Sequence, residues 1–342
     1  MPDDSKNEVP HPEIASRLDR VVSEANKHRG TEPSQAFVEV LNDLSEYAKR
    51  NEFTARRHLA NRIHEVTSPT GAGFLALTLG AGVENGASPR ETIVPVLQAM
   101  LDRTKDISTA DENDEYEEIE DEIDIELAKG LDFFGQSIVA HIQRLDDPRK
   151  TIPNFEEAVE ELERVEHFAN GPTWVLALLR MTSGELVVLH GTTLSGVRVK
   201  YDNISNCFHF FSLLQGAIGT DMPGGKHPDI SVMAKASGDD MGECHDEAWW
   251  HFGQPFSKEA DLASMVFGEM QPTSIGSVDR TQVILLWPPI MQSRSWDSGF
   301  FHPKIESKPA MVNVLSKLTD IEIAEWREKL GLDPAVSIKR SR

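Results

Sequence analysis

The chain has 342 residues and a net charge of −22, with 56 acidic against 34 basic residues, which excludes a broad surface for nucleic acid or anionic lipid. Its two cysteines, Cys207 and Cys244, exclude a disulfide framework, and no apolar run approaches the roughly 20 residues that span a bilayer. Because the polar, acidic N-terminus is also unlike a signal peptide, we expect a cytoplasmic protein that contacts neither nucleic acid nor membrane directly.

The first half of the chain carries helical patterns. We expect a disordered tail over residues 1–10 and a helical domain over 11–170. Phe37, Leu41, Leu44 and Ala48 recur on one helical face and predict a helix over 34–50. Further helices are expected over 12–28 and 52–66, after the Ser88-Pro89 start signal, and from Asn154 to about Asn170.

The segment 71–86 contains five glycines among alanine and leucine. Small residues allow such a segment to lie close to a neighbouring helix. Glycine also weakens a helix by about 1 kcal/mol relative to alanine, so a partly looped segment is the alternative.

The second half of the chain carries strand patterns. We expect a β-rich domain with a terminal helix over 171–332 and a tail over 333–342. Apolar runs at 174–181 and 185–190, separated by Thr182-Ser183-Gly184, predict a hairpin. Further elements are predicted as strands over 197–201, 247–252 and 282–287, a helix over 207–218, and a last helix that begins with a capping box at Thr319 and ends at Gly331.

The two halves also differ in composition, because all six tryptophans follow residue 171. The predicted fold class is therefore α+β. An all-helical N-terminal domain is followed by a mixed α/β domain built on a mainly antiparallel sheet.

An acidic run lies between residues 111 and 126, where 11 of 16 residues are Asp or Glu. Apolar residues recur within and after it at steps of three and four, which predicts an acidic helix near 111–143. One interpretation is a solvated helix face. The other is a surface for a protein partner with a basic surface, with Glu117, Glu118, Asp121 and Glu122 as contact residues. A sharper form of the second interpretation is a nucleic-acid mimic that inhibits a nucleic-acid-binding protein.

The densest group of metal-ligating residue types lies between Glu243 and His251. On one strand, His245, Glu247 and His251 would share a face and form a two-His, one-carboxylate site for a divalent transition metal. Cys244 is a further candidate ligand, and Asp246 or Glu243 a candidate general base. The alternative is an aromatic strand with structural histidines, since HExxH and CxxC patterns are absent from the sequence.

Two aromatic residues, Trp296 and Phe300, lie among turn residues and are candidate partner contacts, or alternatively cap the β core. The sequence contains no P-loop, GxGxxG or GxSxG pattern. We therefore expect a non-enzymatic interaction or regulatory protein without a cofactor. The alternatives are a metal-dependent hydrolase or oxygenase and the nucleic-acid mimic.

Overall fold

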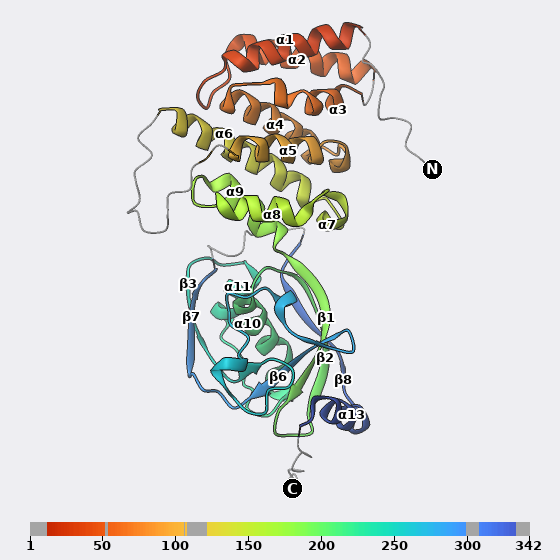
Figure 1. The fold of residues 1–342 in the computed structure, drawn as a ribbon, viewed down its shortest axis with the longest axis vertical. Coiled ribbons are helices and arrows are strands. Elements are labelled where there is room, and N and C mark those ends of the chain that lie inside the picture. Colours follow the sequence, from red (N-terminus) through yellow and green to blue (C-terminus); the bar gives the residue numbers. More distant parts are fainter. Residues whose placement is uncertain (1–11, 52–53, 106, 108–121, 299–307, 333–342) are drawn as a thin grey trace. The chain divides into compact units, whose positions relative to one another are not determined.

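The computed structural model describes residues 12–51, 54–105, 107, 122–298 and 308–332. The chain divides after Leu179 into a helical unit, Met1–Leu179, and a sheet unit, Arg180–Arg342. Helices make up the first unit and a mixed sheet with helices the second, as Figure 1 shows, so the predicted α+β class is confirmed. The predicted tails at 1–10 and 333–342 lie outside the described residues.

The helical unit stacks its helices in layers, from α1 and α2 at one end to α8 and α9 at the other (Figure 1). In chain order, the elements are α1 (Pro12–Lys27), α2 (Gln35–Asn51), α3 (Thr54–Asn61), η2 (Ile63–Glu65), α4 (Pro69–Glu84), η3 (Pro89–Glu91), α5 (Ile93–Thr104), α6 (Glu122–Ile142), α7 (Pro148–Thr151), α8 (Phe155–Arg164) and α9 (Asn170–Leu179). The predicted helices over 12–28 and 34–50 are confirmed as α1 and α2.

Residues 71–84 of the glycine-rich segment are helical in α4, and only Asn85 and Gly86 form a turn after it, so the segment is a helix over nearly all of its length. Ser68 caps the helix by accepting a hydrogen bond from Gly71 N–H, with Pro69 at the first position. The predicted close approach is confirmed, because a Cβ on Gly73 would overlap the carbonyl oxygen of Gly130 on α6. A Cβ on Gly80 would lie 2.8 Å from the Cα of Ser137. Packing against α6 therefore offsets the weak helix propensity of these glycines.

The close approach of α4 and α6 predicts opposite effects for two alanine substitutions on α4. Gly73→Ala should destabilise the helical unit by about 1–3 kcal/mol, because the methyl group forces the two backbones apart. Gly82→Ala should be neutral or stabilise by up to about 1 kcal/mol, since its Cβ would meet only the Arg56 side chain, at 3.4 Å.

Urea unfolding followed by far-ultraviolet circular dichroism measures both changes. Equal effects of Gly73→Ala and Gly82→Ala would show that the α4–α6 contact is not sterically limiting.

The sheet unit contains a six-stranded sheet with the order β4-β6-β1-β2-β8, in which β5 pairs with β6, and a two-stranded ribbon of β3 and β7. Its elements are β1 (Thr182–His190), β2 (Gly196–Ile204), α10 (Cys207–Ile218), η4 (Gly219–Asp221), α11 (Ile230–Ser237), β3 (Glu243–Glu247), β4 (His251–Gly253), η5 (Leu262–Ser264), η6 (Pro272–Ser274), β5 (Ser277–Val278), β6 (Thr281–Trp287), β7 (Ser293–Asp297), β8 (Met311–Lys317) and α13 (Asp320–Leu330). Only the β1–β6 pair is parallel among the described strands, so the predicted mainly antiparallel sheet is confirmed.

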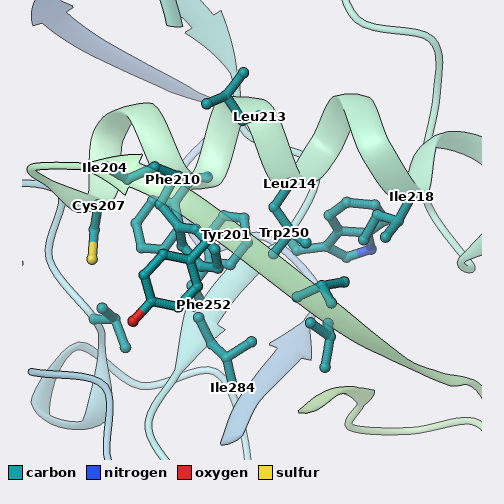
Figure 2. Close-up of a cluster of buried hydrophobic side chains, with 14 of the residues drawn as sticks. Tyr201, Ile204, Cys207, Phe210, Leu213, Leu214, Ile218, Trp250, Phe252 and Ile284 are labelled. Atoms are coloured by element: carbon teal, nitrogen blue, oxygen red, sulfur yellow. The ribbon is translucent and has the colours of Figure 1, made fainter. Parts of the chain in front are cut away.

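The two faces of the large sheet pack against different helices. Leu186 and Val188 of β1 belong to a core with α10, whereas Val187 and Leu189 belong to a core with α13. This alternation is the period-two pattern of a strand that is buried on both faces. Figure 2 shows part of the α10 core, in which side chains of the sheet and of α10 meet around Tyr201, Phe210 and Phe252.

Several predicted elements are corrected. Residues 174–181 are not a strand, because α9 continues to Leu179; a continuous apolar run does not by itself separate a strand from a buried helix. The predicted hairpin turn at Thr182–Gly184 is instead the start of β1. The helix that follows Asn154 ends at Arg164, and Asn170 begins α9. The predicted helix over 207–218 and the Thr319 capping box are confirmed.

Candidate functional site

The ribbon of β3 and β7 brings together most of the predicted site residues. Across the ribbon, Cys244 pairs with Trp296, and Asp246 pairs with Arg294. These four side chains are buried, whereas His245, the neighbour of Cys244, is exposed. Strand alternation therefore directs a mixed polar and aromatic set toward the interior of the sheet unit.

The centre of this set is a buried ion pair between Asp246 and Arg294, whose side chains are each 5% exposed. Arg294 Nη2 donates to an Asp246 carboxylate oxygen and, at 2.8 Å, to Gln215 Oε1 of α10. Ser212 Oγ, also on α10, donates to Asp246 Oδ2 at 2.7 Å. Desolvation lowers the pKa of Arg294, while the adjacent carboxylate opposes this shift. The ion pair therefore ties the ribbon to α10 through charge-assisted hydrogen bonds.

Cys244 and Trp296 are core residues. Burial raises the pKa of the Cys244 thiol to about 11, so the thiol is neutral near pH 7 and is a weak metal ligand there. Trp296 is 6% exposed, and its ring lies 4.8 Å from that of His209. Trp296 is therefore a core residue, as the alternative interpretation expects, and presents little surface to a partner. Phe300 lies outside the described residues.

The structure does not bring the predicted metal ligands to one strand face. The predicted strand over 247–252 is wrong, because β3 ends at Glu247 and the chain enters the large sheet at His251 in β4. His245 and Glu247 are exposed, whereas His251 is 4% exposed and its Nε2 accepts a hydrogen bond from Asp261 N–H at 3.3 Å. Burial lowers the pKa of His251. Among the described residues, no group of three His, Cys, Asp or Glu side chains is arranged to hold a metal ion.

Most of the acidic run lies outside the described residues, including Glu117, Glu118 and Asp121. Glu122 begins α6, but its side chain is not described. The apolar stripe that follows is confirmed in part, since Leu131, Phe134 and Ile138 of α6 are fully buried.

A second acidic surface, which the sequence analysis missed, lies on α8. Four glutamates of this helix are exposed, namely Glu156, Glu157, Glu160 and Glu163. Beside them is a pocket of about 360 Å³ between α5 and α8, here called the Glu157 pocket. Its apolar lining includes Val94, Leu97, Leu101, Ile152 and Ala158. Its charged lining consists of Glu157, Glu161 and Lys105, and Lys105 is paired with Asp102. The sequence signal was present, because Phe155, Ala158 and Leu162 are spaced to bury one face of a glutamate-rich helix.

No known family model, curated protein or solved structure matches this chain. Within the described residues, no helix has both the length and the apolar character needed to cross a membrane.

The buried ion pair predicts strong coupling between Asp246 and Arg294. Asp246→Asn should destabilise the sheet unit by about 3–5 kcal/mol, because it leaves the Arg294 charge buried without a counter-charge. Adding Arg294→Met should recover much of this loss, since the double variant buries no charge.

Urea unfolding followed by tryptophan fluorescence measures the cycle, since five of the six tryptophans lie in the sheet unit. Additive losses in the double variant would contradict a structural ion pair.

Proposed function

We propose that this chain is a cytoplasmic, non-enzymatic interaction or regulatory protein whose helical unit binds a basic, partly apolar segment of a partner protein. The observation that carries the proposal is the Glu157 pocket, a partly apolar depression beside the row of exposed carboxylates on α8. Such a surface suits an amphipathic segment, with apolar side chains in the pocket and Lys or Arg on the carboxylates.

The two carboxylates of the Glu157 pocket differ in whether they are already paired within the fold. Glu161 accepts hydrogen bonds from Thr104 at 2.6 Å and from Arg164 at 2.7 Å. The hydrogen bond with Arg164 lowers the pKa of Glu161, so this group stays charged at neutral pH. Glu157 makes no ion pair with another described residue and remains available to a cation of the partner.

Long-range charge favours the same partner. The chain carries a net charge of −22, and the acidic run over 111–126 belongs to the same unit as α8. A field of one sign accelerates the approach of an oppositely charged protein and makes the association rate depend on salt. We propose that Glu117, Glu118, Asp121 and Glu122 contribute to this steering.

Two designed amphipathic peptides, one of leucine and lysine and the other of leucine and glutamate, test the proposal by fluorescence anisotropy. The Leu/Lys peptide should bind, and the double substitution Glu157→Lys with Glu160→Lys should weaken it about tenfold, or about 1.4 kcal/mol. The same variant should flatten the salt dependence of association, because it removes two attractive charges.

The matched control is Glu259→Lys with Glu325→Lys, two exposed glutamates of the sheet unit that give the same change in net charge. An equal loss of affinity for the Leu/Lys peptide in both double variants would show that net charge alone, and not the α8 surface, accounts for binding. A partner isolated from the native host should be retained by this control and lost from the α8 variant; the reverse result would refute the α8 site.

A further inference from the structure

A second pocket lies elsewhere in the helical unit, between α2, α3 and α4. Its volume is about 620 Å³, within the roughly 300–1,000 Å³ typical of small-molecule sites. Four leucines from the three helices form its apolar floor, namely Leu41, Leu44, Leu59 and Leu79. We call it the Arg56 pocket, after the cation in its wall.

The charged side chains that line the Arg56 pocket differ in whether they already have an ion-pair partner. Lys49 lines the pocket but is paired with Glu46 of the same helix. Arg56 is exposed and has no carboxylate within 4 Å among the described residues. Glu91 also lines the pocket, and the charges of both Arg56 and Arg57 act on it. Of the two cations that line the pocket, Arg56 is therefore the one without a close carboxylate among the described residues.

The Arg56 side chain lies beside Gly82 of α4. A Cβ on Gly82 would lie 3.4 Å from Arg56 Nε and 3.6 Å from its guanidinium carbon. The guanidinium therefore lies across the surface of α4, in the wall of the pocket, rather than extending away from it. Since Gly82 lies two residues after Gly80, it faces about 200° away from the α6 contact.

Glu91, in the same wall of the pocket, is partly desolvated. Burial raises the pKa of Glu91 even though two arginines act to lower it. Charge interactions are stronger in such surroundings than in bulk water. A carboxylate that meets Arg56 can make a bidentate contact with its guanidinium, and this contact adds geometric specificity.

We propose that the Arg56 pocket binds an amphiphilic carboxylate, with its apolar chain on the leucine floor and its carboxylate on the Arg56 guanidinium. A single guanidinium matches one carboxylate. This site involves other helices and the opposite charge from the Glu157 pocket, so it does not rest on the proposed protein partner.

Isothermal titration calorimetry with decanoate, below the concentration at which it forms micelles, tests the proposal. Decanoate should bind with one site per chain. Decanol, which has the same chain without the charge, should bind about tenfold more weakly, and decylamine should bind more weakly still. Absence of decanoate binding, or a preference for decylamine, would overturn the proposal.

Two variants locate the site. Arg56→Gln should weaken decanoate binding about tenfold and leave decanol binding unchanged, because it removes only the charge. Gly82→Leu should abolish binding of both, since the new side chain fills the pocket, and it should preserve the fold because leucine favours helix over glycine. Circular dichroism checks the fold of each variant. Decanoate affinity that is unchanged by Arg56→Gln, or decanoate binding that persists in Gly82→Leu, would overturn the assignment.

Two controls separate this proposal from other sources of binding. Arg144→Gln removes an exposed arginine elsewhere in the helical unit and should leave decanoate binding unchanged. Glu157→Lys should also leave it unchanged, so that the two proposed sites fail independently. A loss with Arg144→Gln as large as with Arg56→Gln would show a general charge effect and refute a specific pocket.

Discussion

The helical unit depends on the close approach of helix backbones at glycine. Gly73 and Gly80 bring α4 against α6, and Gly135 of α6 meets Gly171 of α9 at a distance that leaves no room for a side chain. At such contacts the backbones themselves set the spacing, so side-chain rotation does not relax it. The layers of the unit are therefore fixed around α4 and α6. Helix α4 itself lines the Arg56 pocket, and α5, which packs on α6, lines the Glu157 pocket.

Helix α4 shows how a stiff scaffold can also line a binding site. The glycine face of α4 packs on α6, while Leu79 and Gly82 line the Arg56 pocket. Glu91 precedes α5 and lines the Arg56 pocket, whereas Leu97 and Leu101 of α5 line the Glu157 pocket. A site built on fixed helices loses little conformational entropy when a ligand binds. Less of the free energy gained from the contacts is therefore offset by ordering of the site.

Local patterns in the sequence predicted local structure well. The amphipathic spacing of 34–50 and the Thr319 capping box act within a few residues, and both appear as predicted. The prediction of secondary structure failed where an element is buried on nearly all sides and its sequence has no amphipathic pattern. Residues 174–179, the last part of the buried helix α9, are all apolar, so the spacing of apolar residues could not separate helix from strand. Chain topology explains the error at His251, which joins a different sheet from His245.

The candidate sites were the least predictable part, because they depend on contacts between distant residues. Nothing in the local sequence links Asp246 to Arg294, which lie 48 residues apart and meet only through the pairing of β3 with β7. Likewise, Arg56 reaches the wall of its pocket because Gly82, on another helix, lacks a side chain. In the sheet unit the buried charges of Asp246 and Arg294 neutralise each other, whereas in the helical unit the exposed Arg56 and Glu157 line pockets. Buried charge that is already paired stabilises one arrangement of the ribbon, and charge beside an apolar pocket is available for recognition. This division favours the helical unit as the binding part of the molecule.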